Sequence, residues 1–184
     1  MKFMTRDDAL SLLRKHIQKE NLIKHMVATE ICMKFTAEKL GEDRDAWSLA
    51  GLLHDIDYEL TSDHPERHGK EAQTLLQPLM LSSEILDAIA CHAGYQERTT
   101  NIAKGLYAID PLTGLIIASA LMTPTKSLLS LQPETVMKRF KEKRFAAGAN
   151  RDQIATCSEF GLSLDEFCRI CLSAMQSIHE MLGL

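Results

Sequence analysis

The chain has 184 residues, of which 45% are hydrophobic and 25% are charged, and its formal net charge is -4. This composition excludes a disordered chain and is typical of one folded domain with a single hydrophobic core. The negative charge gives no overall attraction to nucleic acid or to an anionic membrane, so we expect neither as a partner.

Apolar residues recur at helical spacing along almost the whole chain, and no alternating strand pattern accompanies them. Thr5 and Asp8 are typical of the start of a first helix, and Gly41 is typical of the end of a second, over 22–40. Ser163 and Glu166 form a potential capping box at the start of a C-terminal helix. Other helices are predicted over 44–53, 66–76, 82–92, 101–108, 112–122 and 134–140.

We therefore expect an all-α protein that forms one compact helical domain over 1–184, with no flexible linker. Its chemistry is expected at about 20–125, followed by C-terminal helices over 132–184. The uncharged segment 111–125 is shorter than the roughly 20 residues that a membrane span needs, so it is interpreted as a buried core helix. Acidic residues near the start and five scattered cysteines favour a cytoplasmic protein with reduced thiols, Cys168 and Cys171 being core thiols.

The first residues that point to chemistry are the adjacent pair His54 and Asp55. They stand where an apolar helical run ends, and the small residues Ala50 and Gly51 allow that helix to pack closely against a neighbour. Adjacent helical side chains point about 100° apart, but both can reach one ion that lies beyond the helix end.

Four more polar residues lie at the end or on the inner stripe of predicted helices: His25, His68, His92 and Asp110. An unpaired polar group is costly to bury there, so they need a partner. Each histidine alone is typical of a hydrogen-bonded core residue, whereas the joint pattern indicates a metal site. Imidazole and carboxylate without thiolate favour Fe, Mn, Co, Ni or Mg with open coordination positions over a closed structural zinc site.

The order His25, His54-Asp55 and Asp110 resembles the metal signature of the HD superfamily, and HDID looks like its HDIG form. The resemblance covers about 20–125 and includes AGLLHDID, AIACH and LYAIDPLTG. It implies a phosphohydrolase of the small bacterial HDIG type, with a divalent ion bound by these four residues.

His68 and His92 match the extra histidines of the branch of this superfamily that holds two metals, so the resemblance implies a second ion and makes Asp55 the bridging carboxylate. The chain departs from the diadenosine-tetraphosphate hydrolases at Asp57. It also departs from the cyclic-di-GMP phosphodiesterases, which have a double histidine and a GYP motif where this chain has His92 alone. Neither specific substrate is therefore carried over.

The implied reaction is attack on phosphorus by metal-activated water, with a nucleotide or another small phosphate ester as the substrate. Asp57 is expected to be catalytic, by orienting that water or by acting as a base. Lys126, or the basic stretch 138–144, is expected to bind the substrate. Two alternatives stay open: a non-catalytic sensor that binds metal or nucleotide, and a mixed-valent di-iron oxygenase. A homodimer is also left open.

Overall fold

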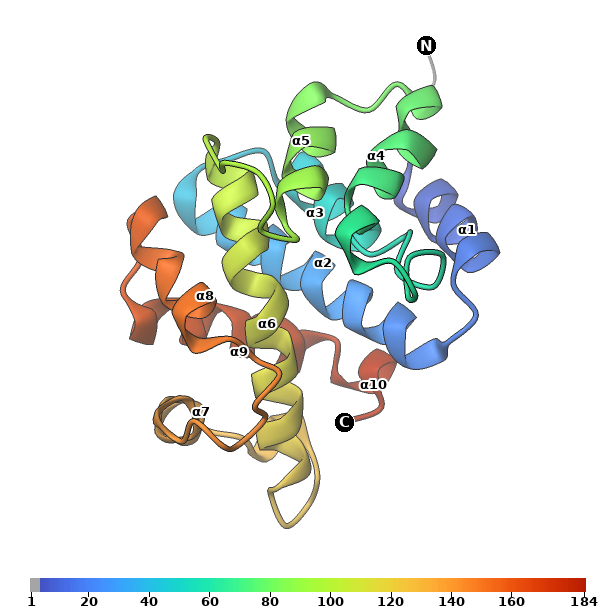
Figure 1. Cartoon of the computed structure of the whole chain (residues 1–184). Coiled ribbons are helices and arrows are strands. Elements are labelled where there is room, and N and C mark those ends of the chain that lie inside the picture. The colour runs from blue at the N-terminus through green and yellow to red at the C-terminus, as the bar shows by residue number, and fades with distance from the viewer. Residues whose placement is uncertain (1–3) are drawn as a thin grey trace.

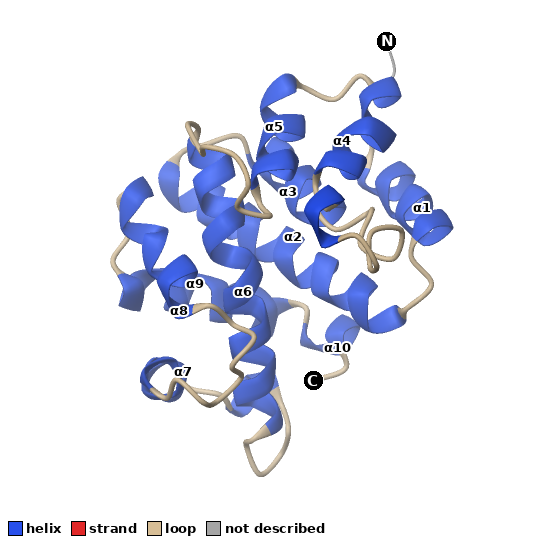
Figure 2. Ribbon diagram, in the orientation of Figure 1, coloured by secondary structure: helices blue, strands red, loops and turns tan. Residues whose placement is uncertain are grey.

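The computed structural model describes residues 4–184, and in that range it contains helices and no strand (Figure 1, Figure 2). The all-α expectation is confirmed, and the first three residues of the expected domain lie outside the described residues. The α-helices are α1 Arg6–His16, α2 Glu20–Leu40, α3 Arg44–Leu53, α4 Lys70–Leu76, α5 Ser83–Cys91, α6 Asn101–Leu121, α7 Pro133–Lys141, α8 Arg151–Ala155, α9 Leu164–Ser177 and α10 His179–Leu182. Short 3-10 turns are η1 Pro65–Arg67, η2 Gln77–Leu79, η3 Leu128–Ser130 and η4 Thr156–Phe160.

Side-chain caps set where several helices begin. Thr5 and Asp8, expected at the start of the first helix, form a capping box in which each side chain receives a hydrogen bond from the other residue's backbone N–H. At α9 half of the expected box is present, because Ser163 accepts from the backbone N–H of Glu166. The Glu166 carboxylate instead pairs with Lys39 of α2 at 2.7 Å, so it ties two helices together.

The expectation of two helices on either side of Pro111 was wrong, because α6 runs through the proline. Proline has no N–H, so the carbonyl of Tyr107 loses its helical donor. The side chain of Gln153 replaces it, with Nε2 donating to the Tyr107 oxygen at 2.8 Å. A residue far along the chain therefore repairs the helix, and this could not be predicted from local sequence.

The single helix expected over 66–76 is also interrupted. His68 has non-helical backbone angles, with φ -58° and ψ 137°, and Gly69 has a φ of 80°, a positive value that favours glycine. A Cβ on Gly69 would lie 3.2 Å from the carbonyl oxygens of Ile89 and Ala90, so glycine also permits a close approach to α5. Because of this break, His68 lies before the start of α4, and its side chain is not confined to one face of a helix.

The long helices α2 and α6 cross at the centre of the molecule (Figure 1). α3 and α9 pack on α2, and α5 and α8 pack on α6. The α2–α3 contact is so close that a Cβ on Gly51 would lie 2.9 Å from the backbone of Glu30. The missing side chain permits this approach, which confirms the expected role of the small residue. This contact sets the distance between the polar residues that the two helices carry.

α6 is the only helix of the described chain that is long and apolar enough to cross a membrane. In the fold, 61% of the most apolar 18-residue stretch of α6 is buried among the other helices. This burial is what a central core helix requires. Residues 111–121 of the segment expected to be a core helix form the second half of α6, and residues 122–125 lie in the turn that follows.

The five cysteines are free and buried, as expected for core thiols. Burial raises the pKa of Cys168 and of Cys171, which disfavours the reactive thiolate. The CxxC pair therefore belongs to the core.

Candidate metal centre

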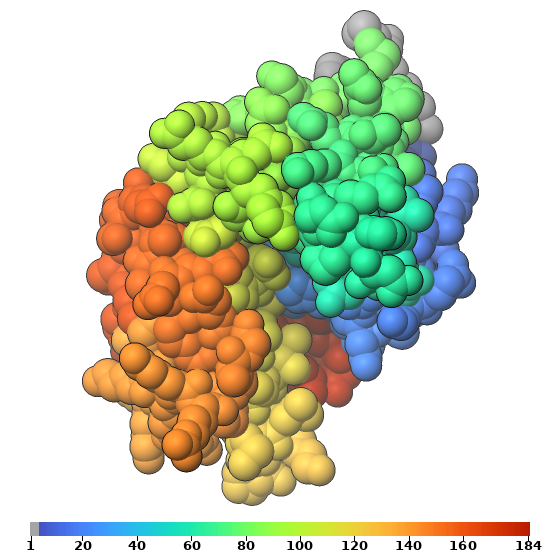
Figure 3. Space-filling model, in the orientation of Figure 1, coloured from blue at the N-terminus to red at the C-terminus, as the bar shows by residue number. Residues whose placement is uncertain are grey.

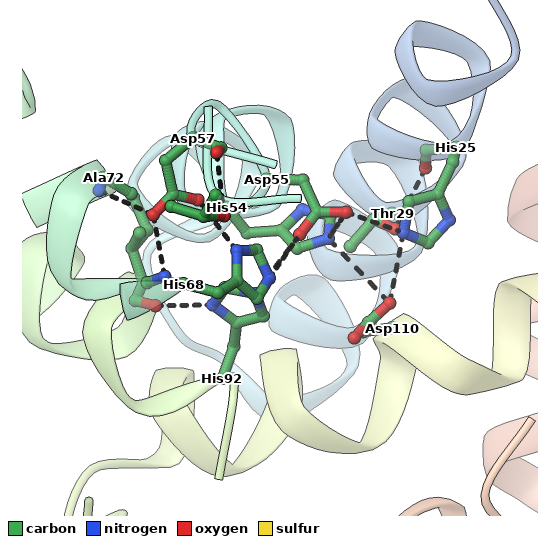
Figure 4. A network of polar contacts seen from close by, with 12 residues as sticks. His25, Thr29, His54, Asp55, Asp57, His68, Ala72, His92 and Asp110 are labelled. Atoms are coloured by element: carbon green, nitrogen blue, oxygen red, sulfur yellow. Dashed lines mark hydrogen bonds and ion pairs between the residues drawn. The ribbon is translucent and has the colours of Figure 1, made fainter. Parts of the chain in front are cut away.

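Three helices bring four of the expected ligands together (Figure 4). His25 lies on α2, His54 caps the end of α3, Asp55 follows in the next turn, and Asp110 lies on α6. His25 Nε2 is 3.1 Å from Asp110 Oδ1 and 3.6 Å from Asp55 Oδ2. His54 Nε2 is 3.4 Å from Asp55 Oδ2 and 3.8 Å from Asp110 Oδ1. We call His25, His54 and Asp110 the first half-site.

His68 and His92 form a second half-site on the other side of Asp55 (Figure 4). Their Nε2 atoms lie 3.1 Å and 3.2 Å from Asp55 Oδ1, and 3.0 Å from each other. One carboxylate oxygen thus faces each half-site, as a bridging ligand between two ions requires. The six residues that were expected to bind metal are therefore brought together.

Backbone carbonyls orient the two most buried imidazoles. His54 Nδ1 donates to the carbonyl of Gly51 at 2.8 Å, and His92 Nδ1 donates to that of Ile89. Each carbonyl lies three residues earlier in the same helix. These bonds hold a proton on Nδ1 and direct Nε2 at the centre, so that its lone pair is available to an ion; this is the usual outer support of a metal-binding histidine.

Thr113 supports His25 in a similar way. Its hydroxyl donates to the Asp110 carbonyl at 2.8 Å, so its oxygen accepts from His25 Nδ1 at 3.1 Å. The Thr113 oxygen thus receives the Nδ1 proton, and His25 Nε2 faces Asp110 and Asp55.

Asp57 orients His68, and it lies behind that imidazole as seen from the centre (Figure 4). Its Oδ1 accepts from His68 Nδ1 at 2.9 Å, while Oδ2 accepts from the backbone N–H groups of Gly69 and Ala72 at 2.8 and 2.9 Å. The side chain has no exposed surface. Three donors therefore occupy a carboxylate that was expected to act on water.

The residues present fit a cation. His54 Nε2 is buried and has no hydrogen-bond partner, an arrangement that costs free energy unless another group satisfies the atom. The Nε2 lone pairs of His68 and His92 face each other at 3.0 Å and repel unless a proton or a cation lies beside them. Imidazole nitrogen and carboxylate oxygen are ligands that divalent transition metals accept.

Both carboxylates of this centre are held in their ionised, negatively charged form. Burial raises the pKa of Asp55, but the charge of His54 and hydrogen bonds from the imidazoles hold it well below its usual value. Burial also raises the pKa of Asp110, but the hydrogen bond from His25 and the charges of His25 and His54 together hold it below its usual value. Burial lowers the pKa of His54, yet Asp55 and Asp110 raise it to about 9. Without an ion, protons are therefore held where cations can bind.

Two clefts reach the centre, and Asp110 lines both. The surface is hollowed between the green segment around residues 60–70 and the orange segment around residue 150 (Figure 3). The first cleft, of about 360 Å³, is lined by Tyr58, Thr61, Ser62, Pro65, His68, His92, Ala93, Tyr95, Asp110 and Gln153. The second cleft, of about 370 Å³, is lined by His25, Asp110, Pro111, Gly114, Ala146, Gly148 and Ala149.

The residues expected to supply positive charge for the substrate lie elsewhere. α6 continues for about three turns, roughly 16 Å, beyond Asp110, and Lys126 is exposed in the turn that follows α6. Arg139 of the basic stretch, on α7 at the lower left of Figure 1, pairs at 2.7 Å with Glu142, which follows the end of that helix. Neither Lys126 nor any residue of 138–144 lines either cleft.

The sequence analysis missed several residues of the site. Tyr58 and Tyr95 line the first cleft, and each stands close in sequence to an expected ligand, so their proximity was a usable signal. Thr113 follows Asp110 by three residues and could have been found as its helical neighbour. Gln153 has no such signal, because it comes from a helix far along the chain.

Comparison with known proteins agrees with this centre. A family model described as HD domain matches residues 22–121. Similar proteins include ribonuclease Y of Bacillus pumilus (strain SAFR-032), 31% identical over 140 residues, or 72% of this chain and 26% of the relative. Ribonuclease Y of Bacillus subtilis (strain 168) is 30% identical with the same coverage.

Ribonuclease Y 2 of Pediococcus pentosaceus is 32% identical over 95 residues, 52% of this chain and 18% of the relative. The chain thus spans about a quarter or less of the length of these curated relatives. It has no significant match among solved structures. Because the family model covers more than half of the chain and all six expected ligands, the chain belongs to the HD domain family, whose members are generally metal-dependent phosphohydrolases.

Proposed function

We propose that this chain is a metal-dependent phosphohydrolase that acts on a nucleotide or another small phosphate ester. The convergence of four imidazole Nε2 atoms and the Asp110 carboxylate around Asp55 carries the proposal. Such a donor set, with clefts on two sides, leaves room for water and substrate beside an ion.

The first half-site would hold one divalent ion and the second half-site another, with Asp55 shared between them. A bound divalent ion lowers the pKa of water and polarises a phosphoryl oxygen. Asp110 lines both clefts, so it would stand beside the reacting phosphate. We assign Asp57 a positioning role, because its oxygens accept from His68 and two backbone N–H groups.

The walls of the first cleft support a small substrate with an uncharged, flat part. Tyr58 and Tyr95 are 44% and 54% exposed there, and aromatic faces can stack on a base. Among the described residues, the lining of this cleft includes no Lys or Arg. The ions would therefore carry the phosphate charge, while neutral groups contact the rest of the molecule.

A phosphodiester of RNA is the second candidate, because the relatives are named ribonuclease Y. Binding along an RNA strand depends on basic side chains that neutralise successive phosphates. The cation-free lining of the first cleft and the net charge of -4 favour the small substrate over the strand.

The test is a phosphate-release screen on protein loaded with Mn, Co or Fe, using nucleoside monophosphates, other small phosphate esters and a labelled RNA. We expect turnover of a small ester, its loss in His54→Ala, and its retention in His16→Ala, which alters an exposed histidine on α1. Turnover of RNA alone would favour the second candidate. Silence on the whole panel with metal bound would contradict both.

Two further readouts separate the remaining alternatives. Nucleotide binding without turnover, measured by calorimetry, would indicate a sensor module. Oxygen consumption and a paramagnetic signal from a half-oxidised iron pair would indicate a di-iron oxygenase.

A further inference from the structure

Gln153 is a polar residue of the first cleft that the metal centre does not use. It lies on α8, outside the segment 22–121 that matches the HD domain, and it lines the cleft together with Asp110, His68 and His92. A neutral amide in this position can contact a substrate without competing for the ions.

The amide is held in place by the interrupted hydrogen bonding of α6. Gln153 Nε2 donates to the Tyr107 carbonyl, which Pro111 leaves without a helical donor. Tyr107 precedes Asp110 by three residues, so the same helix fixes a metal ligand and the amide. Within residues 4–184, Gln153 Oε1 accepts no hydrogen bond, and this oxygen remains available to a ligand.

The backbone of α8 is also fixed. Asn150 Oδ1 accepts from the backbone N–H groups of Asp152 and Gln153 at 3.0 and 3.1 Å. The guanidinium of Arg151 donates to several carbonyls of the preceding loop, among them that of Ala149. Gln153 is therefore presented to the cleft by a preorganised element, which is what a specific contact requires.

We propose that Gln153 is a substrate-binding residue whose Oε1 accepts a hydrogen bond from a hydroxyl or amine on the leaving group of the phosphate ester. This inference rests on the proposed phosphohydrolase function and adds which leaving group of the substrate the enzyme selects. Tyr58 and Tyr95 provide flat apolar surface in the same cleft, so the group selected is a flat, uncharged moiety that carries hydrogen-bond donors, such as a nucleoside.

The test compares two substrates in Gln153→Ala and in Gln153→Met, which keeps the side-chain length. Nucleoside 5′-monophosphates carry donors on the leaving group, whereas the leaving group of p-nitrophenyl phosphate carries none. We expect kcat/KM for the nucleotides to fall about three- to tenfold, the effect of one neutral hydrogen bond, with p-nitrophenyl phosphate unchanged.

Gln176→Ala is the matched control. Its Nε2 also donates to backbone carbonyls, those of Leu128 and Leu131, but it lies on α9 and does not line the first cleft. It should leave both activities unchanged. Equal losses on both substrates, or no loss on either, for Gln153→Ala and Gln153→Met would overturn the proposal.

If the wild type hydrolyses no ester, the proposed function fails, and calorimetry with nucleoside 5′-monophosphates still tests Gln153. Weaker binding by both variants than by the wild type supports the contact. Unchanged binding, or no binding by the wild type, overturns it.

Discussion

The two half-sites are built by different means. In the first, His25, His54 and Asp110 project from α2, α3 and α6, helices whose packing also forms the core. In the second, His68 lies between η1 and α4, outside any helix, and His92 follows the end of α5. The position of the first half-site is therefore set by apolar packing, whereas that of the second depends on local polar contacts.

The supports of the imidazoles differ accordingly. Neutral oxygens of Gly51 and Thr113 orient the histidines of the first half-site. A buried carboxylate, Asp57, orients His68 in the second. A carboxylate partner makes an imidazole more basic than a neutral partner does. The second half-site is thus expected to be the more sensitive to loss of one side chain.

The largest effect is expected where the two half-sites meet. Asp55→Ala removes the oxygen that faces each of them, so both ions should be lost and activity should fall by about a thousandfold or more, equivalent to several kcal/mol of transition-state stabilisation. Metal content and phosphate release measure this. Asp63→Ala, which alters an exposed carboxylate in the following segment, is the control. Full metal content in Asp55→Ala would show that the halves do not share this ligand.

The pH dependence of the metal-free protein tests both halves together. Burial lowers the pKa of His54 and of His68, but neighbouring aspartates raise them to about 9 and about 10. A raised folded-state pKa stabilises the fold below the unfolded value of 6.5, and this stability is lost as the pH rises through 9 and 10.

Denaturant unfolding in a chelator should therefore show a lower free energy of unfolding at pH 9 than at pH 6, by about 3 kcal/mol for a group shifted as His54 is. Added divalent metal should reduce the loss, because the ion replaces the protons. A free energy that rises between these pH values would contradict the electrostatic description.

Asp57→Asn tests the second half-site separately from the first. Loss of the charge behind His68 should weaken the second ion and lower kcat by about ten- to a hundredfold, as for other outer supports of metal ligands, while the first ion stays bound. Thr113→Val removes the neutral support of His25 and should have the smaller effect. Metal titration and the pH–rate profile of both variants measure the difference. Equal effects would show that the charge of the support is unimportant.

Gly51→Ala tests whether apolar packing sets the first half-site. The new Cβ would lie 2.9 Å from the backbone of Glu30, so α2 and α3 must separate, at a cost of about 1–3 kcal/mol. Gly114→Ala is the matched helical control, because nothing lies within 4 Å of its Cβ; it should stabilise α6 by up to about 1 kcal/mol. Thermal unfolding of both variants, with metal affinity for Gly51→Ala, is the measurement.

Local patterns predicted most of the fold. The apolar spacing placed α2, α3 and α5 within two residues of their observed ends, and caps such as Thr5 and Ser163 placed the starts of α1 and α9. The errors occur where a tertiary contact overrides the local signal. Gln153 allows α6 to continue through Pro111, and Asp57 holds the backbone at Gly69 in a break.

The candidate site divides in the same way. The six ligands carry a recognisable order along the chain, so they could be predicted. The first cleft was only partly predictable: Tyr58 and Tyr95 stand close in sequence to expected ligands, whereas Gln153 reaches the cleft from α8 and gives no local signal. Positive charge in the sequence was a poor guide, since neither Lys126 nor any residue of 138–144 lines either cleft.

The smallest effect is expected for Lys126→Ala. Lys126 was predicted to bind substrate, but it is exposed in the turn beyond the end of α6, far from both half-sites. Screening by salt at such a distance removes most of its influence on a phosphate held at Asp110, because the Debye length is about 8 Å at physiological ionic strength. We expect kcat/KM to change less than about twofold, and Gln153→Ala assayed in parallel provides the positive comparison. A large rise in KM for Lys126→Ala would mean that the substrate extends along α6 well beyond the first cleft.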